Sequence, residues 1–228
     1  MSSKILLPKV KNLQHVDYAR EIYRGNNVID INFKPQGYVY GPIRLSLDEG
    51  PIYEHINKPL IDSDILLNTK LVAMVRDPRD ILVSFYYSIT KSHTFSRVSE
   101  IRELQETNRE RWINEGLEGY LTEKSPTLNK QFELLISILK SNKNSYVLRF
   151  EDMVDDFPVF RNTIRSAFDL ENSALENIYK NTRPQIAEDE ERHRRSGKTR
   201  GFKEKISAKQ IGELNATLMK SLAYFDYD

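Results

Sequence analysis

Short apolar runs alternate along the chain with longer segments whose apolar residues recur at helical spacing. A short apolar segment covers residues 4–7, and strands are predicted over residues 28–33, 38–47 (with a loop at Gly41-Pro42), 71–76 and 146–150. Helices are predicted over residues 13–24, 77–91, 128–139, 158–168, 174–180 and 211–222, and the charged segment 95–120 is interpreted as a helix or helical insertion. Strands that alternate with helices are typical of a parallel α/β sheet.

Two of these helices have recognisable start signals. The string Ser125-Pro126-Thr127 precedes the helix at residues 128–139, and proline is favoured at a first helical position. Ser207 and Gln210 form a capping box before the last helix. These signals predict that the helix after the charged segment begins near residue 125 and that the last helix begins at Ser207.

Length and composition exclude several classes of protein. The 228 residues suit one well-buried domain, and a net charge of +1 gives no global field toward nucleic acid or membrane. The absence of cysteine excludes disulfides, thiolate metal sites and a cysteine nucleophile. No apolar run reaches the length of a membrane span, and the N-terminus lacks an apolar signal-peptide core. We therefore expect a soluble, cytoplasmic protein that has no membrane or nucleic-acid partner.

The strand at residues 71–75 leads directly into a sharp helix start. Asp77 can accept hydrogen bonds from the first free amides of the helix, and Pro78 occupies the first helical position, where a missing N–H has no cost. Arg76 is left at the carboxyl end of the strand, beside a helix N-terminus, where phosphates bind in open α/β sheets. Ser84 follows about two turns into the helix, so its hydroxyl and the Arg76 guanidinium can meet on one anion.

The string Arg76-Asp77-Pro78-Arg79-Asp80, followed by Ser84, resembles the 3′-phosphate-binding segment of the PAPS-dependent sulfotransferases. In that family the matching Arg and Ser hold the 3′-phosphate of 3′-phosphoadenosine 5′-phosphosulfate (PAPS). The resemblance implies a P-loop-NTPase-like three-layer sandwich, with helices flanking a central parallel sheet of four or five strands, and residues 1–228 are predicted to form this single domain. The alternative interpretation of these residues is purely structural: a strand, a helix started by proline and a surface ion pair.

Two later segments resemble the same family, in the same order. Residues 149–154 resemble its Tyr-Glu-Asp-Leu element, which implies that the ring of Phe150 contacts the adenine; alternatively, Phe150 is a core residue and Glu151-Asp152 caps the next helix. Residues 195–207 resemble its Arg-Lys-Gly-x-x-Gly-Asp-Trp-Lys-x-x-Phe-Thr pattern, which folds over the 3′-phosphate. Arg195, Gly197 and Lys198 are the implied phosphate-binding residues there.

The third segment departs from the family pattern at Ser196, Gly201 and Phe202, which replace Lys, Asp and Trp. One cationic contact to the phosphate is therefore expected to be weaker. The alternative for this run is a solvated charged loop.

The catalytic part of the family site is matched less closely. The family loop Pro-Lys-Ser-Gly-Thr-Thr-Trp has only Pro8-Lys9-Val10-Lys11-Asn12 as its counterpart, and Lys9 is the residue that would stabilise charge on the leaving phosphate. The family also has a histidine base about twenty residues before the phosphate-binding arginine. His55 precedes Arg76 by 21 residues, without the family's flanking residues. A neutral imidazole suits a general base. There are two alternatives: His55 has a structural role, or His93 is the base.

The resemblance implies a metal-independent transfer of a sulfuryl group from PAPS to an acceptor hydroxyl or amine, with 3′-phosphoadenosine 5′-phosphate (PAP) as the product. The acceptor is expected to be a small molecule or a glycan, and homodimer formation is left open. A catalytically silent PAP-binding module and a nucleic-acid patch over residues 192–205 are the alternatives, and the near-zero net charge argues against the second. A P-loop kinase is disfavoured because no Gly-x-x-x-x-Gly-Lys-Ser/Thr string occurs.

Overall fold

The computed structural model describes residues 14–17, 38–43, 45, 47, 53–168, 175–176, 179–180 and 197–227. The apolar segment 4–7 and the strand predicted over residues 28–33 lie outside this range. None of the helices in the described part of the chain combines the length and the apolarity that a membrane-spanning helix needs.

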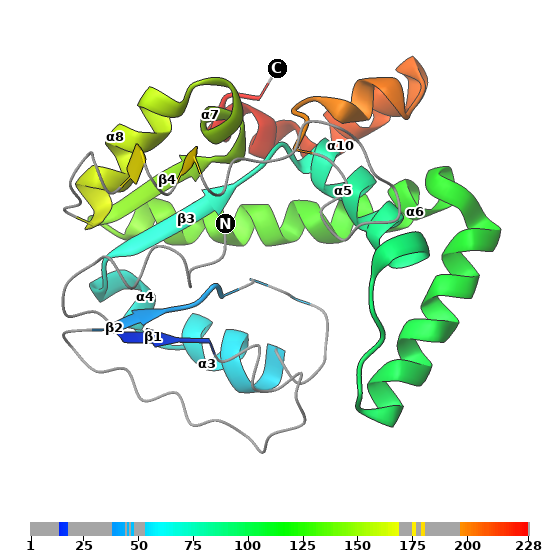
Figure 1. The fold of residues 1–228 in the computed structure, drawn as a ribbon, viewed down its shortest axis with the longest axis horizontal. Helices are drawn as coiled ribbons and strands as arrows, with labels where there is room; N and C mark the ends of the chain where they lie inside the picture. The colour runs from blue at the N-terminus through cyan, green and yellow to red at the C-terminus, as the bar shows by residue number, and fades with distance from the viewer. Residues whose placement is uncertain are drawn as a thin grey trace.

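Four strands in the described ranges form two parallel pairs (Figure 1). β1 (Gln14–Val16) pairs with β2 (Tyr38–Tyr40), and β3 (Leu71–Val75) pairs with β4 (Ser145–Arg149) in a register that places Val75 beside Arg149. The strands predicted near residues 38, 71 and 146 are therefore confirmed. A single sheet of four or five strands is not confirmed by these residues.

The helix predicted from residue 13 is wrong where the chain is described, because Gln14–Val16 is a strand. The backbone of these residues pairs with β2, and Val16 and Tyr40 pack against the buried Ile56 and Leu60. Helical spacing of apolar residues is a local signal, and pairing with a distant strand overrides it.

The remaining elements are mainly helical. They are η2 (Tyr53–Asn57), α3 (Lys58–Ile61), α4 (Ile65–Asn68), α5 (Pro78–Tyr87), η3 (Ser88–Ser92), α6 (Ser99–Ser141), α7 (Phe150–Asp155), α8 (Phe157–Phe168), η4 (Gly201–Glu204) and α10 (Ala208–Phe225). The helices predicted at residues 77–91 and 158–168 and the capping box of Ser207 and Gln210 are confirmed.

The two faces of the β3–β4 pair carry separate apolar clusters, because successive side chains of a strand point to opposite faces. Ala73 and Val75 pack in the cluster formed by α5, α6 and α10, whereas Leu148 packs in the cluster formed by α7 and α8, with Val72 against it. Figure 1 shows the second half of α6 running along the strands and α8 lying beside β4. The strands thus lie between two helical layers, as the predicted three-layer arrangement requires.

The long helix α6 breaks at Gly116 and not at Pro126. Gly116 has φ 72° and ψ 179°, whereas Pro126 lies inside the helix that follows. The helix start predicted at Ser125-Pro126-Thr127 is therefore wrong. The physical reason is that the backbone conformation at the break is open almost only to glycine, so the chain turns at Gly116.

Alanine at Gly116 is expected to lower the free energy of unfolding by about 1–3 kcal/mol, the cost of a side chain in this backbone region. An added Cβ would meet no atom within 4 Å, so the loss of stability would come from backbone strain and not from a steric clash. Gly212, which is exposed and helical in α10, is the matched control. Gly212→Ala is expected to stabilise by about 0.5–1 kcal/mol. Urea unfolding measures the free energy of unfolding of both variants. Changes of the same sign would contradict a helix break at Gly116.

Candidate functional site

The turn from β3 into α5 is organised by Asp77. Its carboxylate accepts a hydrogen bond from the Arg79 amide at 2.9 Å, which confirms the predicted helix cap, and it pairs with the Arg79 guanidinium at 2.7 Å. This ion pair is buried, unlike the surface pair of the alternative interpretation. Arg79 also donates to Asn215 on α10 at 2.8 Å and lies over the ring of Phe202 at 4.4 Å. The turn is thus joined rigidly to the C-terminal part of the chain.

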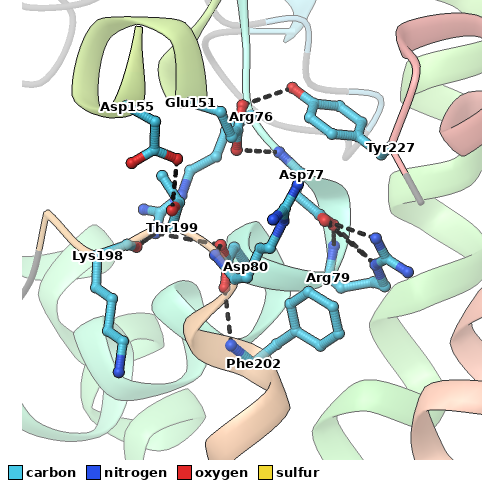
Figure 2. A network of polar contacts seen from close by, with 11 residues as sticks. Arg76, Asp77, Arg79, Asp80, Glu151, Asp155, Lys198, Thr199, Phe202 and Tyr227 are labelled. Carbon is cyan, nitrogen blue, oxygen red and sulfur yellow. Dashed lines mark hydrogen bonds and ion pairs between the residues drawn. The ribbon is translucent and has the colours of Figure 1, made fainter.

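Arg76 meets two of the other predicted nucleotide-binding residues. Its guanidinium Nη2 donates to the backbone carbonyl of Lys198 at 3.0 Å (Figure 2). The guanidinium also lies 4.5 Å from the ring centre of Phe150. The same Nη2 is 3.7 Å from a carboxylate oxygen of Asp80. The Arg76 Nε is buried and has no hydrogen-bond partner among the residues that the structure describes. Three segments that are far apart in the sequence therefore converge at the carboxyl ends of β3 and β4.

The C-terminal segment is held on this turn by carboxylates. Asp80 accepts hydrogen bonds from the backbone amides of Arg200 at 2.8 Å and Phe202 at 2.9 Å, and Thr199 donates to Asp155 at 2.9 Å. From the sequence, Asp80 is predicted only to add negative charge to the first turn of a helix. Its binding to amides more than a hundred positions away has no local sequence signal.

Arg200 is a further departure from the family pattern, in addition to the three already named. It stands where the pattern has its second glycine, and its φ of 57° lies in the left-handed region. Glycine adopts this region without steric cost, whereas other residues are strained there. The segment thus keeps the backbone shape that the family glycine would allow, although an arginine occupies the position.

Glu151 is a second buried carboxylate that links distant segments. Its Oε1 accepts from the amide of Asp77 at 3.0 Å, and its Oε2 accepts from the hydroxyl of Tyr227 at 2.9 Å. The interpretation of Glu151 as a helix cap is wrong, because its carboxylate binds across the strands to the β3–α5 turn. Burial raises the pKa of Glu151, and burial also raises the pKa of Asp80 although the charge of Arg76 opposes that rise.

The raised pKa of Glu151 predicts a pH dependence of stability. A carboxyl whose pKa is raised on folding contributes stability below its ordinary value of 4.5, and this contribution is lost as the pH rises. The unfolding free energy of the wild type is therefore expected to fall, relative to that of the neutral variant Glu151→Gln, between pH 4.5 and neutrality. Urea unfolding over a pH series measures this difference. The exposed control Glu103→Gln should show the same dependence of unfolding free energy on pH as the wild type. Parallel pH profiles for the wild type and Glu151→Gln would contradict a raised pKa of Glu151.

The other predicted site residues are placed less fully. Ser84 is half-buried on α5, and its hydroxyl has no hydrogen-bond partner among the described residues. Gly197 is buried, and the exposed Lys198 ammonium pairs with Glu204. The backbone of His55 lies in η2, before α3. Lys9, Arg195 and the side chain of His55 lie outside the described residues, so their predicted roles stay predictions.

The arrangement is suited chemically to an anionic nucleotide. At the end of two parallel strands, the Arg76 guanidinium lies beside an aromatic ring and the backbone that follows the buried Gly197, and one of its N–H groups has no acceptor in the described part of the chain. Such donors bind phosphate through charge-assisted hydrogen bonds. The described residues contain no group of three or more His, Cys, Asp or Glu side chains placed to hold a metal ion.

Comparison with known proteins agrees with this geometry. A search of curated proteins finds no match to the chain. The family model described as "Sulfotransferase domain" matches residues 45–226, which include β3, β4 and the C-terminal segment but not Lys9. This family has a P-loop-like α/β fold, in keeping with parallel strands between helical layers. Because the match spans most of the polypeptide and contains all three segments that converge at Arg76, the chain belongs to the sulfotransferase family.

Proposed function

We propose that this protein transfers a sulfuryl group from PAPS to the hydroxyl or amine of a small-molecule or glycan acceptor. The observation that carries the proposal is the contact between Arg76, at the end of β3, and the carbonyl of Lys198 in the C-terminal segment. In the family both segments bind the 3′-phosphate of PAPS, and here they lie within hydrogen-bond distance of each other. Membership of the sulfotransferase family supports transfer of this group.

The residues present at the carboxyl ends of β3 and β4 fit the nucleotide end of PAPS. The buried Nε of Arg76 has no acceptor within the described ranges, and a phosphate oxygen would provide one. Arg76, Ser84, Arg195 and Gly197 would hold the 3′-phosphate, with Lys198 as a further cation. The ring of Phe150 would contact the adenine on the face that the Arg76 guanidinium leaves free.

The catalytic roles are assigned to two residues by resemblance. PAPS, when bound, supplies the activated sulfuryl group, and PAP is the product. Lys9 would place a positive charge where negative charge develops on the departing phosphate. The imidazole of His55 would accept the proton that the acceptor hydroxyl or amine loses.

Calorimetric titration with PAP and PAPS, beside a radiolabelled transfer assay on a panel of hydroxyl and amine acceptors, tests the proposal. Binding with transfer of label supports a sulfotransferase, and failure to bind either nucleotide contradicts the proposal. Binding without transfer to any acceptor would favour a second candidate, a PAP-binding module without turnover. The residues Pro8-Lys9-Val10-Lys11-Asn12 favour that candidate, because they lack the glycine, serine and threonine of the family loop.

A further inference from the structure

Asp80 joins the two proposed phosphate-binding segments, in addition to the hydrogen bond between Arg76 and the carbonyl of Lys198. Its side chain is 3% exposed and lies in the first turn of α5, one turn after Arg76. One carboxylate oxygen accepts from the amide of Arg200 and lies 3.7 Å from the Arg76 guanidinium, while the other accepts from the amide of Phe202. A single buried carboxylate therefore contacts both the arginine that ends β3 and the backbone of the C-terminal segment (Figure 2).

We propose that Asp80 is a positioning residue, which holds residues 197–202 against Arg76 so that both can act on one 3′-phosphate. The inference rests on the proposed function, because it concerns the same nucleotide site. Asp80 itself does not contact the nucleotide in this proposal. It acts through Arg76 and through the backbone amides on either side of Gly201.

The backbone shape of the segment explains why a carboxylate is needed there. The left-handed conformation of Arg200 lets two nearby amides converge on one acceptor, an arrangement that forms an anion-binding concavity. In this protein the concavity is filled by the carboxylate of Asp80. The amides of Arg200 and Phe202 are therefore not available to a ligand, and the phosphate must be held by Arg76 and by groups nearer to Gly197.

Two effects of opposite sign follow from removing the charge of Asp80. Loss of a negative charge near the site favours an anionic ligand, whereas loss of an acceptor frees at least one buried amide and loosens the segment. Charge-assisted hydrogen bonds are about twice as strong as neutral ones, and a buried amide without a partner is costly. We expect the second effect to be larger, so that the 3′-phosphate is bound less tightly when Asp80 is neutral.

Asp80→Asn, which is nearly isosteric, tests this by comparing two ligands. PAP carries the 3′-phosphate, and adenosine 5′-monophosphate (AMP) lacks it. The variant is expected to bind PAP about tenfold more weakly, while its affinity for AMP stays within about twofold of the wild type because that ligand does not reach Arg76. Equal losses for both ligands would indicate a merely structural role, and an unchanged or tighter affinity for PAP would overturn the proposal. Asp62→Asn, at an exposed aspartate after α3, is the control and should leave both affinities unchanged.

Hydrogen exchange gives a second measurement that needs no ligand. In Asp80→Asn at least one of the amides of Arg200 and Phe202 should exchange at least about tenfold faster than in the wild type, because the carboxamide keeps only one of the two acceptor oxygens. Unchanged exchange would show that Asp80 does not anchor the segment. If Asp80→Asn does not fold, Asp80→Glu is used in its place. The added methylene keeps the charge but displaces the segment, so we expect the same weaker binding of PAP and unchanged binding of AMP.

The two measurements separate this inference from the proposed function. A wild-type protein that binds no PAP contradicts the proposed function and, with it, a role for Asp80 in phosphate binding. Hydrogen exchange would then decide the anchoring role alone. A wild type that binds PAP, together with an Asp80→Asn variant of unchanged selectivity between PAP and AMP, would refute the positioning role and leave the proposed function intact.

Discussion

Replacing Arg76 by alanine is expected to weaken PAP binding by about 2–4 kcal/mol, the range for losing a charge-assisted contact to a partly buried anion. The guanidinium lies where the C-terminal segment meets the end of β3, and its side chain is only 20% exposed. Alanine removes the cation and also the hydrogen bond to the carbonyl of Lys198. Calorimetric titration of both proteins with PAP measures the difference.

Two further variants control for effects on folding and charge. Arg102→Ala removes an exposed arginine that pairs with Glu106 within the same helix, and such surface pairs contribute little to stability or to a distant site. Its PAP affinity should equal that of the wild type. Arg76→Lys keeps the charge but not the forked donors, and an intermediate loss is expected. Wild-type affinity in a folded Arg76→Ala variant would refute the assignment of this site.

Much of the site could be predicted from the sequence because its signals are local. A run of apolar residues before Arg76, an aspartate and a proline at a helix start, and a capping box at Ser207 each depend on neighbours within a few positions. The structure places these features in β3, α5 and α10 as expected. Resemblance to the family then related β3, β4 and the C-terminal segment to one another, which local patterns cannot do.

The features that were missed depend on distant contacts or on one backbone angle. The strand at Gln14–Val16 exists because of its pairing with β2, and the same residues fit a helical pattern when they are considered alone. The hydrogen-bond donors to Asp80 and Glu151 are more than seventy positions away, and a charged residue gives no indication of which amide it will bind. The break at Gly116 required a choice between that glycine and Pro126, and proline is the stronger local signal.

Phe202 connects the stability of the protein with the shape of the site. Its side chain is 0% exposed and belongs to the core cluster that includes Leu214 and Leu218 of α10. The ring lies beneath the guanidinium of Arg79, and its amide is bound by Asp80. Phe202 thus anchors the end of the C-terminal segment in the core, at the position where the family pattern has a tryptophan.

Phe202→Ala is expected to lower the free energy of unfolding by about 3–5 kcal/mol, because a buried ring is removed and a cavity remains. Urea unfolding measures the loss. Phe85→Ala is the matched control: the Phe85 side chain is 48% exposed on α5, and its removal should cost less than about 1 kcal/mol. Equal losses in the two variants would contradict the burial of Phe202. If Phe202→Ala remains folded at low temperature, its segment keeps its hydrogen bonds to Asp80, Asp155 and Arg76 but loses its anchor in the core. Its affinity for PAP should therefore fall, while that of Phe85→Ala should not.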